Sequence, residues 1–476
     1  MTGLLPITLV NEVLCVAVLG WVLSGATFRL LCKSKFIVSG CSFDSPRMGD
    51  AHLSPSAPTV DMSGRESPQE GDADFMSDTA APPLTGIRVL DFSQAASGPF
   101  ATLFMADMGA DVIKVERPGV GDFSRQMGVP MFGPQETDYV MAVNRSKRSI
   151  VIDLATERGS QLARELIAEC DVVVQNYRPD VAAKLGIDFD SVKSCRPGLV
   201  YCSITGFGEG GPWGGRPAND IIIQAASGMM GVTGEFGGKP VKMGSPVADF
   251  STGLFALAGI LAALQCRDEH PEGQHVTVSM IESALAMLSN YVPRVVTMGY
   301  DVPRLGTAHA QIVPYDGFEC ADKPILIGAF NDGFWRSLCE ALDRKEWIAD
   351  ERYLTGPDRL ANRDSLTAEL SEILRTKPRR HWQELLDAAG VPNCGLFDLD
   401  EAVRTEQVKH LGAILHLESE RGSVDVVDFP PKSSAWERVP ARWPATLGEH
   451  TEDVLTSVLG VAPDEIARMI SDGVVA

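Results

Sequence analysis

The stretch Lys242–Gly253, KMGSPVADFSTG, sets one acidic side chain, Asp249, among small residues that leave room for a bulky ligand. An apolar, helix-favouring run begins at Thr252, so the acid is predicted just before or within the first turn of a helix. The positive field of a helix N-terminus would keep this carboxylate ionised, as a carboxylate nucleophile must be. The same position also suits an aspartate that only caps the helix, and the pattern alone leaves both roles open.

The region before this stretch alternates strand-like and helix-like patterns. Pro99 is suited to the first position of a helix, and residues 159–170 carry apolar side chains at helical spacing. The predicted strands are residues 87–92, 111–116, 148–154, 171–176 and 199–207. This alternation predicts an α/β fold with a mostly parallel sheet, in which ligands bind at the carboxyl ends of the strands.

Five motifs over Pro83–Asp301 together resemble the class III CoA-transferase family, also described as CaiB/BaiF or formyl-CoA transferase-like. The motifs are GIRVLDFSQAASGPFATLFMADMGADVIKVERPGVGD, NRSKRSIVIDL, DVVVQNYRPDVAAKLG, YCSITGFGEGGP and VADFSTG. The resemblance implies that Asp249 is the covalent nucleophile. It also implies a large Rossmann-like domain, a smaller α+β domain and a homodimer of two interlocked rings.

The resemblance also assigns residues that contact coenzyme A, which would be a substrate rather than a permanently bound cofactor. Arg117 matches an arginine at the CoA nucleotide, and a guanidinium fork suits phosphate. Lys184 stands where the formyl-CoA enzymes carry an arginine. The full set of implied contacts is Ala96, Ser97, Arg117, Ile152, Asp153, Leu154, Ala155, Asn176, Tyr177, Arg178, Lys184, Asn219 and Asp220.

The loop RPAND, Arg216–Asp220, distinguishes two chemistries within the resemblance. Related 2-methylacyl-CoA racemases carry a histidine where this chain has Asn219, and moving an α-proton needs two acid/base groups. Asn219 does not titrate, which argues against racemase or isomerase activity. Asp220 stays open as an alternative working acid, and a non-catalytic CoA-binding protein is a third possibility.

The segment Gly306–Tyr315, GTAHAQIVPY, replaces the glycine-rich loop of the formyl-CoA enzymes. It looks more like the branch that acts on dicarboxylates, exemplified by succinate–hydroxymethylglutarate CoA-transferase. That likeness implies succinyl-CoA as the donor and a dicarboxylate as the acceptor. His309 and the weaker candidate Arg304 are then expected to bind the free carboxylate of the substrate.

Composition narrows the partners and suggests the domain boundaries. A net charge of −21 argues against a nucleic-acid partner, and the ten cysteines show no CxxC pair and no metal-binding spacing. No metal site is expected. The predicted division is a large CoA-binding domain over 83–300, a small α+β domain over 301–405 and a return to the large domain over 406–476.

Residues 1–82 differ from the rest of the chain. Val13–Phe28 is an uncharged apolar run, shorter than a bilayer span, and a Ser-, Pro- and Gly-rich linker follows it. A membrane anchor, an unusual targeting segment and translated sequence upstream of the true start all fit. We expect a cytoplasmic enzyme, with mitochondrial or membrane-associated locations as the alternatives.

Overall fold

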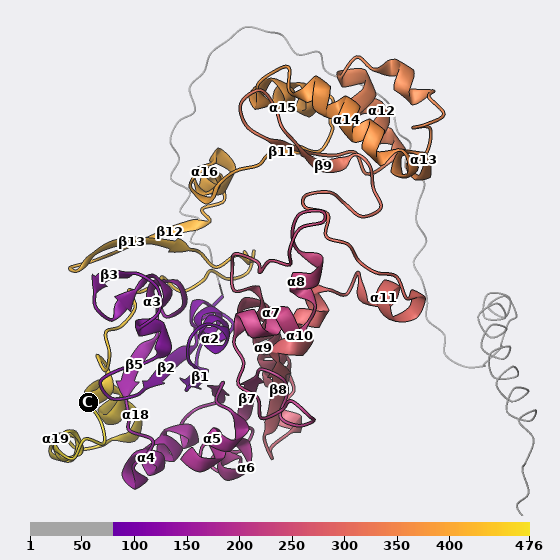
Figure 1. Ribbon diagram of the computed structural model, residues 1–476. Coiled ribbons are helices and arrows are strands. Elements are labelled where there is room, and N and C mark those ends of the chain that lie inside the picture. Colours follow the sequence, from indigo (N-terminus) through magenta and orange to yellow (C-terminus); the bar gives the residue numbers. More distant parts are fainter. Residues whose placement is uncertain (1–79) are drawn as a thin grey trace, which may run out of the picture. The chain divides into compact units, whose positions relative to one another are not determined.

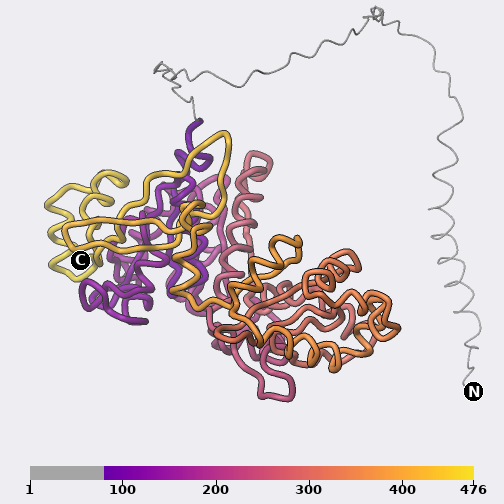
Figure 2. The backbone as a smooth tube through the Cα atoms, turned by 90° about the horizontal axis from the view of Figure 1, so that it is seen from above, coloured from indigo at the N-terminus to yellow at the C-terminus, as the bar shows by residue number. Residues whose placement is uncertain are grey.

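The computed structural model describes residues 80–476, which belong to one compact unit, Met76–Ala476 (Figures 1 and 2). The predictions for residues 1–79 lie outside the described residues.

A six-stranded sheet is the centre of the fold, with the strand order β5-β2-β1-β6-β7-β8. Every neighbouring pair is parallel, as the sequence predicts. The strands are β1 (Arg88–Asp91), β2 (Asp111–Glu116), β5 (Arg148–Val151), β6 (Val172–Gln175), β7 (Val200–Thr205) and β8 (Gln274–Ser279). Strand β8 is missing from the sequence prediction, because this edge strand alternates polar and apolar residues instead of forming a buried apolar run.

Helices cover both faces of this sheet and bury successive strand residues on opposite sides. Val89 packs with α2 and α9 on one face, whereas its neighbour Leu90 packs with α4, α18 and α19 on the other. The bounds are α2 (Ser97–Asp107), α4 (Glu157–Ala168), α9 (Val247–Gln265), α18 (Thr451–Leu459) and α19 (Pro463–Ser471). Burial on both faces explains why apolar residues occupy adjacent positions in these strands, as at Val89 and Leu90, instead of alternating with polar ones.

Shorter helices complete the part of the chain up to residue 298. They are α3 (Asp138–Val143), α5 (Pro179–Leu185), α6 (Phe189–Val192), α7 (Asp220–Ala226), α8 (Met229–Val232), α10 (Met280–Met287) and α11 (Val292–Met298). Among the described helices, only α9 is long and apolar enough to cross a membrane by length and composition. It packs against α2, α10 and β8, which is the position of a core helix.

A second hydrophobic core forms around a three-stranded antiparallel sheet of order β11-β10-β9. The strands are β9 (Tyr315–Phe318), β10 (Ile325–Gly328) and β11 (Asn393–Gly395). The helices that contribute to this core are α12 (Asp332–Ala341), α13 (Gly356–Ala361), α14 (Arg363–Leu374) and α15 (Arg379–Ala388). The helices α16 (Leu399–Val403) and α17 (Glu406–His410) follow in the chain and have no buried residues.

Two hairpins lie outside these sheets, and the chain then ends beside β5. The hairpins pair β3 (Pro130–Gly133) with β4 (Glu136–Thr137), and β12 (Ile414–Ser419) with β13 (Gly422–Val427). Helix α18 contacts β5 and α4, and Val475 forms a bridge with Ile152 (Figure 1). These contacts are compatible with the predicted division at 300 and 405, which stays a prediction.

Candidate active site

Asp249 lies in the first turn of α9, where this helix packs closely against the start of α2. A Cβ atom on Gly253 would lie only 2.6 Å from the backbone oxygen of Ser97, so the contact requires glycine. Gly253 therefore serves helix packing, and this packing brings the carboxylate next to the Ser97 side chain.

Asp220 provides the cap that α9 lacks. The N-cap residue of α9 is Pro246, which has no capping side chain. Asp220 instead accepts hydrogen bonds from the backbone N–H groups of Ala248, at 2.8 Å, and Asp249, at 3.4 Å. Asn219 in turn caps α7 by accepting from the N–H of Ile222 at 3.3 Å. The two residues of the RPAND loop thus each hold a helix end.

Gln224 ties Asp220 to the loop that leads into α9. This fully buried side chain donates from Nε2 to Asp220 at 2.6 Å and accepts from the N–H of Met243 at 2.8 Å. Because a backbone N–H can only donate, the contact with Met243 defines the orientation of the Gln224 amide. One glutamine therefore positions both the capping carboxylate and the backbone six residues before Asp249.

The pKa of Asp249 differs from what the sequence predicts. Burial raises the pKa of Asp249, the Asp220 charge raises it further and the Ser97 side chain opposes the rise, giving a pKa of about 7. The expectation that the helix N-terminus keeps Asp249 ionised is thus wrong. The reason is that burial disfavours the charged form and that the neighbouring Asp220 carboxylate adds a like charge.

Two cavities meet at Asp249, one of about 160 Å³ and one of about 640 Å³. Both are lined by residues that follow β1, β6 and β7, together with Asp249 itself. The shared lining is Gln94, Ala95, Asn176, Tyr177, Ala218, Asn219 and Asp249. The carboxylate therefore faces two spaces at the carboxyl ends of the strands, where a parallel sheet is expected to bind its ligand.

The loop between β1 and α2 forms one wall of both cavities and is held from two sides. Asn176 accepts from the N–H of Gln94 and donates to its carbonyl oxygen, each at 2.8 Å. Asp122 accepts from the N–H of Ala95 at 2.8 Å. Ala95 has a φ of 66°, in the left-handed region that non-glycine residues seldom adopt, so these bonds maintain a strained conformation.

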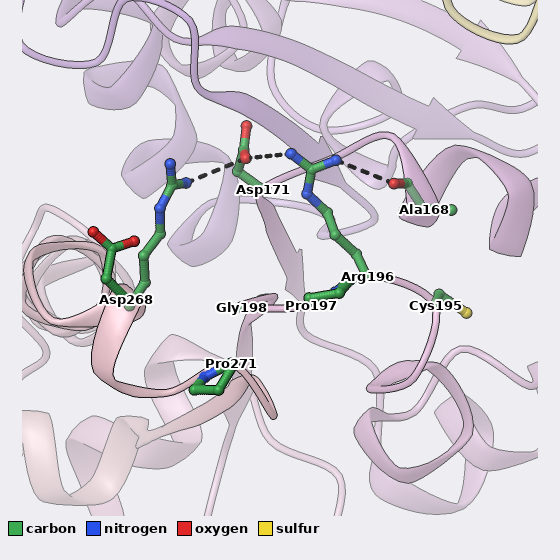
Figure 3. Close-up of a pocket in the computed structure, with 9 residues that line it drawn as sticks. Ala168, Asp171, Cys195, Arg196, Pro197, Gly198, Asp268 and Pro271 are labelled. Atoms are coloured by element: carbon green, nitrogen blue, oxygen red, sulfur yellow. Dashed lines mark hydrogen bonds and ion pairs between the residues drawn. The ribbon is translucent and has the colours of Figure 1, made fainter.

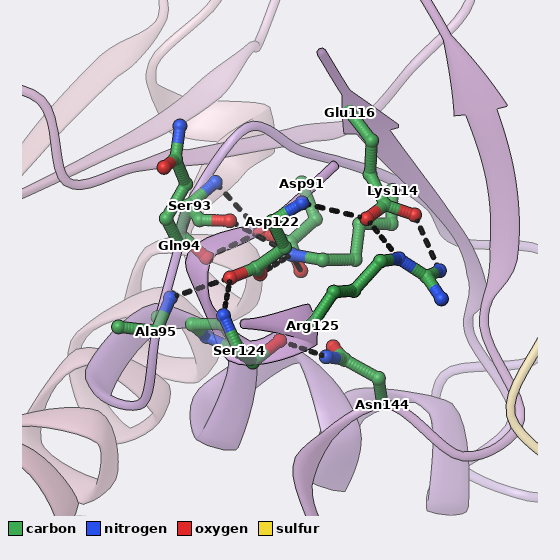
Figure 4. A network of polar contacts seen from close by, with 12 residues as sticks. Asp91, Ser93, Gln94, Ala95, Lys114, Glu116, Asp122, Ser124, Arg125 and Asn144 are labelled. Atoms are coloured by element: carbon green, nitrogen blue, oxygen red, sulfur yellow. Dashed lines mark hydrogen bonds and ion pairs between the residues drawn. The ribbon is translucent and has the colours of Figure 1, made fainter. Parts of the chain in front are cut away.

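Beneath this loop lies a buried set of charges, called here the anchoring network. It consists of Asp91, Lys114 and Asp122, which Figure 4 shows, and of Lys147. Lys114 lies 2.6 Å from Asp122 and donates to the carbonyl oxygen of Ser93 at 2.8 Å. Lys147 lies 3.2 Å from Asp91. The network joins β1, β2 and the start of β5 to the loop that lines the site.

Comparison with known proteins identifies the family. The model of CoA-transferase family III matches residues 84–451. The chain belongs to this family. It is 35% identical over 394 residues to a human succinyl-CoA:glutarate CoA-transferase, covering 83% of this chain and 90% of the relative. It is 37% identical over 390 residues to a succinate–glutarate CoA-transferase of Agrobacterium fabrum, covering 79% and 96%.

A comparison with solved structures supports the same family assignment. A crystal structure of a CaiB/BaiF family protein from Brucella suis matches with a TM-score of 0.72 and 34% identity, covering 80% of this chain and all of the other. Family membership and the α/β fold class predicted from the sequence are therefore confirmed.

Within this family III CoA-transferase, the structure brings together only part of the predicted CoA-binding set. The residues that line one or both cavities at Asp249 are Ser97, Asn176, Tyr177, Arg178, Asn219 and Asp220. Ala96 is buried beside this lining. For all of them, contact with CoA stays a prediction.

The remaining predicted contacts do not line these cavities. Arg117 is exposed, although its charge acts on the nearby Tyr177 phenol. Lys184 is 78% exposed and lies 3.8 Å from Asp180. The segment Ile152–Ala155 is bound to the C-terminal end of the chain, since the N–H of Asp153 donates to Val474 at 2.8 Å. The buried Ile152 side chain belongs to the core, so only main-chain contacts are open to this residue.

Arg304 and His309, predicted to bind the substrate carboxylate, also lie outside both cavities of the described chain. Arg304 donates to the backbone oxygens of Gly231 and Gly238. His309 accepts at Nδ1 from two backbone N–H groups and stacks on Tyr315. Both side chains thus have structural contacts, and their substrate role stays a prediction.

Four residues at the site were missed by the sequence analysis. Gln94, Tyr139 and Lys242 line the larger cavity, and Gln224 supports it from behind. Gln94 and Lys242 lie within the sequence stretches quoted above, so their closeness in sequence to the predicted site residues could have identified them. Tyr139 and Gln224 carry no such signal, because packing alone brings them to the site.

A further cavity, of about 460 Å³, lies at the opposite, amino-terminal ends of the strands (Figure 3). Asp171 precedes β6 there and accepts from Arg196 at 2.7 Å and from Arg267 at 3.2 Å. Its other oxygen accepts from the N–H of Arg88 at 2.9 Å. This carboxylate is fully engaged in joining three segments, unlike Asp249.

Proposed function

We propose that this enzyme transfers CoA from succinyl-CoA to a dicarboxylic acid through covalent intermediates on Asp249. The observation that carries the proposal is the position of Asp249 at the junction of two cavities, one suited to a thioester and the other to an acid. The relatives named above, which act on succinyl-CoA and glutarate, support this choice of substrates.

In the proposed mechanism, the Asp249 carboxylate attacks the thioester carbonyl of the donor. The C–S bond breaks, leaving a mixed anhydride and CoA thiolate. The thiolate then attacks the Asp249 carbonyl carbon, which releases the donor acid and forms an aspartyl–CoA thioester. The acceptor carboxylate then attacks the aspartyl–CoA thioester, which releases CoA thiolate and forms a second mixed anhydride. The thiolate attacks the acceptor carbonyl of this anhydride, giving the acceptor acyl-CoA and regenerating the Asp249 carboxylate. Each intermediate stays activated, so the transfer needs no ATP.

The developing oxyanions are best stabilised at the N-terminus of α2. The first N–H groups of a helix have no intrahelical partners, and α2 lacks a capping side chain. Ser97, the first residue of α2, lies beside Asp249. Donors aimed at the developing charge would lower both barriers, provided that bound substrate excludes water from the anhydride.

The enzyme is further proposed to act as a homodimer in the cytoplasm. Helix α11 supports the dimer, because none of its residues is buried and Val296 is 78% exposed. Such an apolar helix is typical of a surface covered by a partner. Light scattering of the purified protein tests this, and a strictly monomeric mass would contradict it.

The central test is mass spectrometry of the protein incubated with succinyl-CoA and then hydroxylamine. Hydroxylamine should convert the activated Asp249 to a hydroxamate, and Asp249→Ala should abolish both this mark and CoA transfer to glutarate. Asp138→Ala, which removes an exposed acid outside both cavities, serves as the control and should keep the mark.

The same experiment separates the alternatives. If the wild-type protein stays unmodified and racemises an enantiopure 2-methylacyl-CoA, the racemase hypothesis replaces the transferase hypothesis. A wild-type protein that binds CoA but does neither would be a non-catalytic binding protein.

A further inference from the structure

The basic side chains around Asp249 are divided between the two cavities. Arg178 and Arg216 line the smaller cavity, and neither lines the larger one. Lys242 is the one basic residue in the lining of the larger cavity, which it shares with Asp220 and Asp249. A negatively charged substrate entering this space therefore meets two acids and a single cation.

The Lys242 ammonium is available for a ligand. In residues 80–476 it forms no ion pair within 4.0 Å, and its hydrogen bond goes to the backbone oxygen of the next residue, Met243, at 3.4 Å. A basic side chain that lines an acidic cavity without an ion-pair partner is suited to an anionic ligand.

The backbone beside Lys242 is also held at a defined place relative to Asp249. The N–H of Met243 donates to Gln224, Gln224 donates to Asp220, and Asp220 accepts from the first turn of α9. Three hydrogen bonds thus connect the residue next to Lys242 with the helix that carries the nucleophile. The backbone next to Lys242 is therefore tethered to α9, and the exposed lysine side chain extends into the cavity lining from this fixed point.

On these grounds we propose that Lys242 determines specificity for dicarboxylates by pairing with the distal carboxylate of the acyl group and of the acceptor. The inference rests on the proposed function, since it assumes that one carboxylate of the substrate reacts at Asp249. The reacting end then occupies the junction of the cavities, and the chain extends into the larger one. In the larger cavity the distal carboxylate of the substrate is repelled by Asp220 and attracted by Lys242.

Pairing with a carboxylate is favoured over pairing with a CoA phosphate by the division of charge. The two arginines that suit phosphate, Arg178 and Arg216, lie along the smaller cavity, and Arg178 starts the turn after β6 where the family resemblance implies CoA contact. Lys242 lines the larger cavity and not the smaller one, which leaves it in the space available to the acid.

The test compares glutarate with pentanoate, a monocarboxylate of the same chain length, as acceptors. In a double-displacement reaction kcat/KM for the acceptor depends only on the second half-reaction. Lys242→Met should lower kcat/KM for glutarate about 10- to 100-fold, the loss expected for one charge-assisted hydrogen bond, and leave pentanoate unchanged. Lys242→Arg should restore most of the glutarate activity. Lys239→Met, an exposed lysine outside the cavity, is the matched control and should change neither acceptor.

Two outcomes would overturn the inference. Equal losses for glutarate and pentanoate, or for succinyl-CoA and butyryl-CoA as donors, would assign Lys242 to the CoA moiety or to general structure. No loss for glutarate would remove any role in specificity.

A binding measurement separates failure of this inference from failure of the proposed function. In an Asp249→Asn background with CoA present, calorimetry with glutarate needs no turnover. Glutarate binding that is lost in Lys242→Met supports the lysine even if the wild type transfers no CoA. Binding that is the same with and without the lysine contradicts it.

Discussion

Asp91 and Asp249 show opposite uses of one residue type on the two sides of the loop Gln94–Ser97. Burial alone would raise the pKa of Asp91, but Lys114 and Lys147, with hydrogen bonds from neighbouring hydroxyls, lower it to about 2. Burial raises the pKa of Asp249, the Asp220 charge adds to the rise, and no cation among the described residues opposes it, so the pKa reaches about 7. The sign of the nearest charge therefore separates a structural carboxylate from the proposed nucleophile.

The comparison extends to the amino-terminal ends of the strands, where Asp171 is paired with two arginines (Figure 3). Asp91 and Asp171 are saturated by cations and backbone donors, and they join segments of the sheet. Asp171 also borders a cavity, but Asp249 is the acid of the three that has no ion-pair partner within the described residues. This lack of ion-pair partners supports the proposal that Asp249 forms a covalent bond with the substrate.

The largest effect is expected from removing the paired carboxylate. Asp91→Asn leaves Lys147 without its ion pair and should lower the free energy of unfolding by about 3 kcal/mol, because breaking a buried pair leaves an uncompensated charge. Urea unfolding at pH 7 measures this. The control is Asp111→Asn, which removes the half-exposed partner of Arg88 and Arg148 and should cost less than about 1 kcal/mol. Equal losses for the two variants would show that the anchoring network carries no special stability.

The second prediction concerns the effect of the Asp220 charge on the pKa of Asp249. The nucleophile must be ionised, so kcat/KM for the acyl-CoA should fall as the pH drops below about 7. Asp220→Asn removes a negative neighbour, which favours the charged form of Asp249 and should move this acidic limb about one pH unit lower. A pH profile from 5.5 to 9 tests the shift. An unmoved limb would mean that burial alone sets the pKa of Asp249.

The smallest effect concerns stability at the reactive carboxylate. Because its pKa is raised on folding, ionised Asp249 destabilises the native state, and this cost grows from about pH 4 to about pH 7. Asp249→Asn should therefore raise Tm by roughly 2 °C at pH 8 and by less than about 1 °C at pH 5. Differential scanning calorimetry at both pH values measures it. A lower Tm at pH 8 would contradict an unfavourable charge at this position.

Much of the fold was predictable because it depends on local patterns. Continuous apolar runs identify five of the six parallel strands, and the spacing around Pro99 and Thr252 identifies α2 and α9. Strand β8 was missed because its half-exposed edge position gives it an alternating pattern. Asp249 itself was predictable as an acid in the first turn of α9, since that position follows from the helix boundary.

The properties of Asp249 were decided only by the tertiary structure. The cap from Asp220 and the tether through Gln224 join segments that are distant in sequence, and no local pattern records which helix end a side chain will reach. Burial and the neighbouring charge then reversed the expected direction of the pKa shift. The sequence by itself determined the order of the elements and the identity of the acid. Its reactivity depends on distances across the fold, because electrostatic interactions act through space and not along the chain.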